Sequence, residues 1–134
     1  MSFLGAYVLF FKNYFNFKGR STRKDYWLVQ ACHFFIYFIL IIGLFQTGIH
    51  PLFTLLLVVY TLFIIIPQMS LTIRRFRDAG LSGKWFILLL AMTMIITFLP
   101  ESFELPKFLK WLDAGLNFIQ FYILVLPSKQ IVKN

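Results

Sequence analysis

The chain has 134 residues, of which 60% are apolar and 20% aromatic, whereas only 13% carry a charge. Its mean hydropathy is +0.79. A soluble domain of this length needs a polar surface that this composition does not supply, so the composition excludes a water-soluble fold and indicates a membrane protein. The net charge of +8 must then be explained by where the cations lie along the chain.

The first apolar segment predicts an amphipathic helix over residues 3–15. Its large side chains recur at helical spacing, and Lys12 interrupts the run. No small-residue cleavage site follows, so a helix in the cytoplasmic membrane interface is favoured over a signal peptide. A frayed terminal tail is the alternative.

Four further apolar segments are long enough, or nearly so, to cross a bilayer. They cover residues 27–45, 51–73, 85–99 and 108–126. A helix rises about 1.5 Å per residue, and the hydrocarbon core is about 30 Å thick. The segments lack the alternation of membrane strands. The sequence therefore predicts an all-α integral membrane protein, with residues 1–134 forming one transmembrane domain of four helices.

A capping signal marks the start of the first transmembrane helix. Thr22 is followed three residues later by Asp25, which resembles a capping box with Asp in place of Glu. This pattern predicts that the helix begins just before Trp27.

Lysine and arginine are concentrated in alternate linkers, and this distribution predicts the orientation of the chain. Short cytoplasmic loops retain more Lys and Arg than external loops do. The segment before the first span and the linker after the second span are basic, while the turn between these spans has no charge. The third linker has Lys107 against Glu101 and Glu104, and Lys129 and Lys133 follow the last span. Both termini are therefore predicted to be cytoplasmic.

Two basic segments on the predicted cytoplasmic side are candidate binding sites. They run from Phe17 to Trp27 and from Arg74 to Trp85. The planar guanidinium group suits phosphate oxygens, so these segments are expected to bind anionic lipid headgroups or an acidic partner protein. Membrane topology alone would also place cations here, and it accounts for the net charge without a nucleic-acid partner. The candidate binding residues are Arg20, Arg23, Lys24, Arg74, Arg75, Arg77 and Lys84.

Other residues in the two segments are expected to order them. Glycine permits tight backbone turns, aspartate can pair with a neighbouring arginine, and tryptophan prefers the membrane interface. These predicted structural residues are Gly19, Asp25, Trp27, Asp78, Gly80, Ser82, Gly83 and Trp85.

The two segments resemble the paired signatures of the small bacterial inner-membrane proteins catalogued as domain of unknown function 805. In that family, a Gly-Arg, spaced Arg and aromatic-Trp motif precedes the first span. An Arg-Arg-Leu-His-Asp motif, followed by Gly and Ser-Gly-Trp-Trp, precedes a later span. The matching positions here are Phe17, Gly19, Arg20, Arg23, Tyr26 and Trp27, then Arg74, Arg75, Asp78, Gly80, Ser82, Gly83 and Trp85.

The resemblance implies a bacterial inner-membrane location and a helical fold, but it brings no established activity. Arg77 stands where the family usually has His, and Lys84 replaces one of the paired Trp residues. The tail after Leu126 lacks the Asn- and Gly-containing ending of many members. If the family His acts in catalysis or proton transfer, this chain cannot work in that way.

Polar residues inside two predicted spans suggest an alternative function. They lie on one face of the first and of the last span, at Gln30, His33, Asp113, Asn117 and Gln120. If the two stripes meet, they form a polar seam suited to a small transporter or channel subunit, expected to act as a homo-oligomer. The simpler interpretation is that these residues hold helices together. The sequence shows no nucleophile–base pair and no metal-ligand spacing, so neither an enzyme nor a cofactor is predicted.

Overall fold

The computed structural model describes residues 2–48, 50–98 and 107–129, which form five helices. The helices are α1 (Phe3–Lys12), α2 (Arg23–Gln46), α3 (Pro51–Asp78), α4 (Gly83–Phe98) and α5 (Lys107–Val125). The described ranges contain no strand. The predicted all-helical fold is confirmed for this part of the chain.

Local capping explains where α1 ends and α2 begins. The Thr22 hydroxyl accepts a hydrogen bond from Asp25 N at 3.2 Å and donates one to Asp25 Oδ2 at 2.8 Å, which confirms the predicted cap. The α1 helix stops at Lys12, short of the predicted residue 15, because the Asn13 side chain donates to Leu9 O at 2.8 Å and so caps the last turn.

The α3 helix continues beyond the predicted span of residues 51–73. The interpretation of residues 74–78 as part of a linker is therefore corrected, because these residues form the last turns of α3, whereas residues 79–82 do connect α3 to α4. The helix ends where Leu81 N donates to Phe76 O and Gly80 N donates to Arg77 O, a Schellman motif. Gly80 has a φ of +88°, which glycine adopts without strain.

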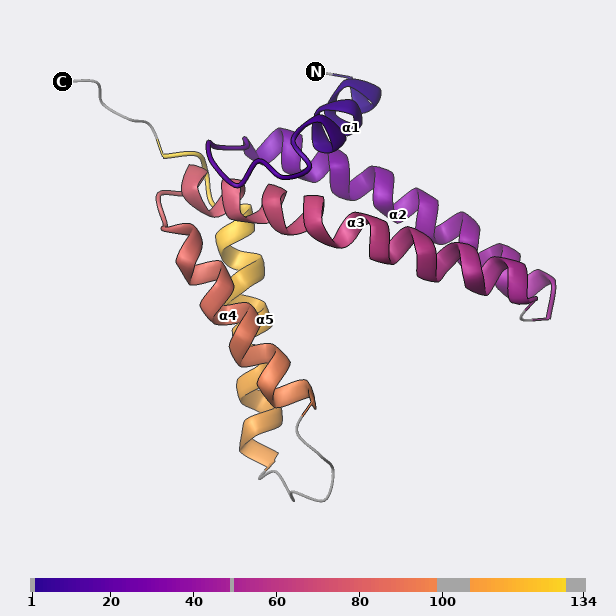
Figure 1. The fold of residues 1–134 in the computed structure, drawn as a ribbon. Helices are drawn as coiled ribbons and strands as arrows, with labels where there is room; N and C mark the ends of the chain where they lie inside the picture. Colours follow the sequence, from indigo (N-terminus) through magenta and orange to yellow (C-terminus); the bar gives the residue numbers. More distant parts are fainter. Residues whose placement is uncertain (1, 49, 99–106, 130–134) are drawn as a thin grey trace.

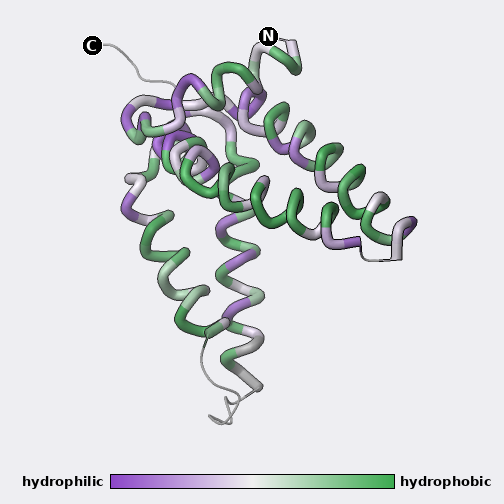
Figure 2. Tube along the Cα trace, turned by 45° about the vertical axis from the view of Figure 1, so that its right-hand side comes forward, coloured by the Kyte–Doolittle hydropathy of each residue, from purple (hydrophilic) through white to green (hydrophobic). Residues whose placement is uncertain are grey.

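The helices form two pairs that diverge from a common end (Figure 1). The α2 and α3 helices run side by side, as do α4 and α5. We call the common end the junction: it holds α1, the first turns of α2 and α4, and the last turns of α3 and α5. Hydrophilic residues gather at the junction, whereas α4 is hydrophobic over most of its length (Figure 2). The α3 helix contacts all four other helices.

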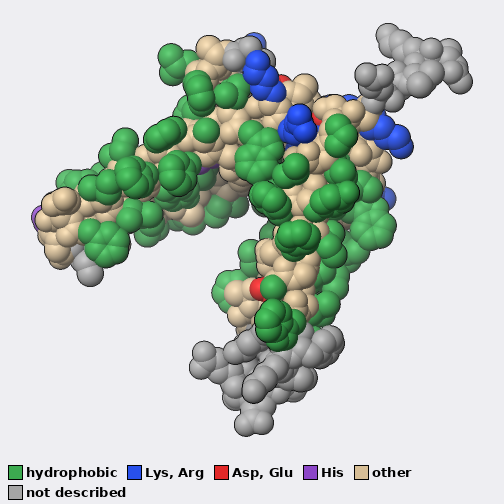
Figure 3. All heavy atoms as spheres, turned by 180° about the vertical axis from the view of Figure 1, so that it is seen from behind, with side chains coloured by type: hydrophobic (Ala, Val, Ile, Leu, Met, Phe, Trp, Pro, Cys, Tyr) green, Lys and Arg blue, Asp and Glu red, His purple; other side chains and the backbone are tan. Residues whose placement is uncertain are grey.

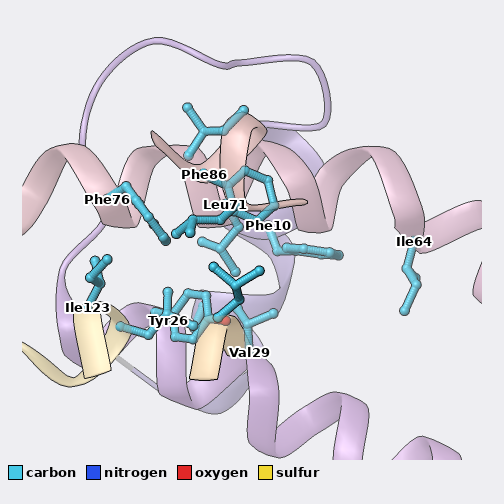
Figure 4. Packing of buried hydrophobic residues seen from close by; sticks show 13 residues of the cluster. Phe10, Tyr26, Val29, Ile64, Leu71, Phe76, Phe86 and Ile123 are labelled. Carbon is cyan, nitrogen blue, oxygen red and sulfur yellow. The ribbon is translucent and has the colours of Figure 1, made fainter. Parts of the chain in front are cut away.

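The buried core lies mainly at the junction, and all five helices contribute to it. Figure 4 shows side chains from all five helices converging on one cluster, with Ile64 to one side. The core residues are Ala6, Phe10, Tyr26, Val29, Ile64, Leu71, Ile73, Phe76, Phe86, Leu89, Leu116, Ile123 and Leu124.

The α2–α3 pair and the α4–α5 pair extend from the junction as two arms, and both arms have apolar surfaces. Two helices, α2 and α3, are long and apolar enough to cross a membrane, and only 11% of the most apolar stretch of each is buried. The α4 helix and residues 111–125 of α5 are shorter apolar helices. In Figure 3, green apolar side chains cover the arms while the Lys and Arg side chains gather near the junction. Apolar surfaces this extensive are typical of helices that contact lipid.

Candidate functional site

Arg75 is fully buried at the junction, and its guanidinium group is held by partners within the chain. Its Nη1 donates to Asp78 Oδ2 at 2.7 Å, its Nε donates to Leu124 O at 3.1 Å, and its Nη2 donates to Leu126 O. The last two acceptors are carbonyls at the C-terminal end of α5, where backbone oxygens lack helical partners. Arg75 therefore ties the end of α5 to the end of α3.

Asp78 extends this connection to the residues that follow α5. Its carboxylate also accepts a hydrogen bond from the Ser128 hydroxyl, and its carbonyl accepts one from Lys129 N at 2.8 Å. A Cβ on Gly80 would lie 2.5 Å from Lys129 Cδ, so glycine also leaves room for this segment. We call this set of contacts the C-terminal clamp. It is formed by Arg75, Asp78, Leu124, Leu126, Ser128 and Lys129.

The two sequence-predicted basic segments lie against each other. Arg77 Nη1 donates to Phe17 O at 2.6 Å, and Ser21 N donates to Arg74 O at 3.3 Å. The Ser70 hydroxyl lies 2.7 Å from Asn16 O, to which it donates. These bonds hold the α1–α2 connection along the last turns of α3, so both segments contribute to one surface.

A pocket of about 170 Å³ opens between α1, the α1–α2 connection, the start of α2 and the end of α3. We call it the junction pocket. Half of its lining is polar and half apolar. The polar lining residues are Asn13, Arg20, Ser21, Asp25 and Arg74, and the apolar ones are Ala6, Leu9, Phe10, Val29 and Leu71.

Arg74 is the buried cation of this pocket, with 7% of its surface exposed. Its Nε makes a long hydrogen bond of 3.4 Å to Ser70 O. Within the described ranges, the terminal guanidinium nitrogens of Arg74 have no hydrogen-bond partner. These nitrogens are accessible from the pocket and are free to donate to a ligand, so the pocket favours an anion with several oxygens.

Burial shifts the pKa of the two arginines that lie beyond the predicted span of residues 51–73. It lowers the pKa of both guanidinium groups, and a nearby carboxylate opposes this shift in each case, Asp25 for Arg74 and Asp78 for Arg75. Arginine stays protonated in proteins, so both groups remain cations.

The remaining candidate cations are more accessible. Arg20, Arg23, Lys24 and Lys84 are exposed, and Arg77 is partly buried. Among the predicted structural residues, Trp27 and Trp85 are exposed by 37% and 54% respectively. Gly19 adopts a φ of +91°, and Ser82 precedes α4 with its hydroxyl 3.4 Å from Lys84 N. Gly83 is buried, and a Cβ there would lie 2.6 Å from Ile73 Cγ2, so the close approach of α4 to α3 requires glycine.

The two polar stripes lie in different helix pairs. His33 Nδ1 and the Tyr60 hydroxyl are 2.6 Å apart, and the same hydroxyl lies 3.0 Å from that of Tyr7. On α5, Asn117 is exposed and donates to Asp113 O at 2.9 Å. Among the described residues, no hydrogen bond joins one stripe to the other, including Gln30 and Gln120. Hydrogen bonds therefore connect the α2 stripe to α1 and α3, and the seam of the alternative hypothesis stays a prediction.

Sequence reasoning missed three residues that build the site, namely Asn13, Ser21 and Ser70. Ser70 acts through long-range bonds to the carbonyls of Asn13 and Asn16 that no local motif marks, whereas the Asn13 side chain bonds locally to Leu9 O. Across the described ranges, no three His, Cys, Asp or Glu side chains are grouped as a metal site would require.

Long apolar helices with outward-facing apolar sides, joined at a basic end, are typical of a helical membrane protein. The sequence matches the family described as "Protein of unknown function (DUF805)" over residues 14–132, and the chain belongs to this family. It is 33% identical over 82 residues to the inner membrane protein YhaI of Escherichia coli K12, covering 61% of this chain and 68% of that protein. It is 28% identical over 89 residues to the inner membrane protein YhaH of the same strain, covering 63% and 71%. No solved structure matches.

Proposed function

We propose that this chain is a non-enzymatic, multi-pass protein of the bacterial inner membrane that binds the phosphate of lipid headgroups at its cytoplasmic junction. In this proposal, α2 to α5 cross the bilayer and both termini are cytoplasmic. The family membership, the names of the two relatives, the apolar arms and the basic junction support the location.

The junction pocket is the single observation that carries the binding proposal. Arg74 reaches it with terminal nitrogens that lack acceptors, and Arg20 lines the same pocket. Phosphate oxygens would supply those acceptors in the forked geometry that guanidinium groups prefer. The apolar half of the lining suits the glycerol and upper acyl carbons of a lipid better than it suits a free ion in water.

The sequence-predicted cations divide into two roles under this proposal. Arg75 belongs to the C-terminal clamp and does not contact the ligand. The exposed Arg23, Lys24 and Lys84 lie outside the pocket and attract the anionic leaflet, at about 1 kcal/mol for each cation near the surface.

The proposal is tested by exchanging one buried cation for a neutral side chain. We expect Arg74→Gln to reduce the phospholipid retained after mild detergent purification at least about tenfold, the factor that corresponds to one lost charge-assisted hydrogen bond. Native mass spectrometry measures the retained lipid. Lys12→Gln is the control, because this cation is exposed, does not line the pocket and has no part in the proposed binding. Equal retention by wild type and Arg74→Gln, with unfolding unchanged, would refute the proposal.

A further inference from the structure

The junction pocket contains a carboxylate as well as two guanidinium groups. Asp25 lines it together with Arg20 and Arg74. We propose that the pocket selects a phospholipid whose headgroup ends in a primary amine, with the phosphate bound by the two arginines and the ammonium group bound by Asp25. This inference rests on the proposed function and names the ligand class of that site.

The charges of the pocket are separated from one another. The described residues contain one ion pair with a nitrogen–oxygen distance below 4.0 Å, that between Arg75 and Asp78. Asp25 therefore forms no ion pair with either pocket arginine. The Asp25 carboxylate accepts one hydrogen bond, from the Thr22 hydroxyl to Oδ2. Its Oδ1 has no hydrogen-bond partner in the described ranges. A site with separated positive and negative groups is complementary to a ligand that carries both charges.

Other phospholipid headgroups fit this charge pattern less well. A phosphate monoester would place up to two negative charges near Asp25, which repels them. A glycerol headgroup offers only neutral hydroxyls to the carboxylate. A trimethylated amine carries the positive charge but has no N–H to donate, whereas a primary ammonium group has three donors.

The size of the pocket supports a headgroup as the bound part. Sites for drug-sized ligands have volumes of about 300–1,000 Å³, whereas this pocket has about 170 Å³. It therefore admits a phosphate and a short amine, while acyl chains must leave it. The exposed apolar residues Leu4, Val8 and Leu9 on α1 offer a surface for those chains.

The test compares lipids that differ only in the headgroup. Wild-type protein is equilibrated in micelles with equal amounts of phosphatidylethanolamine, phosphatidylcholine, phosphatidylglycerol and phosphatidic acid of one acyl composition, and bound lipids are counted by native mass spectrometry. We expect phosphatidylethanolamine to be enriched roughly tenfold over each of the others, the value of one charge-assisted hydrogen bond. If the wild-type protein is enriched in any other lipid over phosphatidylethanolamine, this result alone overturns the inference.

Two variants test whether the headgroup preference depends on Asp25. Asp25→Asn keeps the cap with Thr22 and is expected to remove the preference while total bound phospholipid stays within about twofold. Lys12→Gln is the control, because this lysine is exposed, does not line the pocket and is not among the candidate binding residues. A preference that survives Asp25→Asn would also overturn the inference.

The outcomes separate this inference from the proposed function. If Arg74→Gln loses its bound phospholipid but the wild-type protein shows no headgroup preference, the proposed function is supported. The same result overturns the inference that the pocket selects a primary amine. Competition with inorganic phosphate and with glycerophosphoethanolamine distinguishes a lipid from a soluble ester. We expect neither at millimolar concentration to displace the lipid, and binding of the soluble ester as tight as that of the lipid would refute a lipid ligand.

Discussion

The C-terminal clamp gives a quantitative prediction for the variant Arg75→Leu. Arg75 has no exposed surface and Asp78 has 6%, so the variant leaves a buried carboxylate without its cation. It also removes the donors to the carbonyls of Leu124 and Leu126. Removing one partner of a buried ion pair costs about 3–5 kcal/mol, and we expect the free energy of unfolding to fall by this amount.

Equilibrium unfolding in mixed detergent micelles, followed by tryptophan fluorescence, measures the effect. A second variant that combines Arg75→Leu with Asp78→Leu removes the unpaired charge and is expected to recover part of the loss, because an apolar pair replaces a buried ion pair at little cost. Arg23→Gln should change stability by less than about 0.5 kcal/mol, as is usual for surface changes. A loss below about 1 kcal/mol for Arg75→Leu would show that the clamp is not the stabilising contact described here.

Two further predictions concern the α2–α3 pair and α5. A Cβ on Gly43 would lie 2.3 Å from the Phe53 ring, whereas Gly115 faces open space. We therefore expect Gly43→Ala to be less stable than Gly115→Ala by about 1–3 kcal/mol, and equal stabilities in the same unfolding assay would contradict the packing. Replacing His33 and Tyr60 by Phe, singly and together, should show a coupling energy of about 0.6–1.7 kcal/mol, and a coupling of zero would mean that their hydrogen bond does not form.

The sequence predicted the helices well because their signals are local. Apolar segments of sufficient length, the cap at Thr22 and the glycine after α3 each act within a few residues of the helix end they determine. The predicted helix ends are wrong by a few residues. The α1 helix ends early at Asn13, and α3 continues to Asp78 because no helix-breaking residue lies between Pro67 and Gly80.

The arrangement of the site could not be predicted in the same way. The sequence identified Arg74 and Arg75 as equivalent candidates, yet one lines the junction pocket and the other binds carbonyls at the end of α5. Backbone carbonyls are present at every residue, so nothing in the sequence marks Leu124 as a partner. Likewise, the stripe through His33 and that through Asn117 have similar spacing, and only the structure shows that His33 bonds to α3 while Asn117 bonds within α5.

The long sequence separation within the C-terminal clamp has a consequence for biosynthesis. Arg75 leaves the ribosome 49 residues before the carbonyl of Leu124 that it binds. Until α5 has been made, the carbonyls that bind the guanidinium group are missing, so water has to reach the end of α3 that carries Arg75 and Asp78 during this interval. The α2–α3 pair can thus be translated before the α4–α5 pair, and the junction core is completed only after α5 has been made.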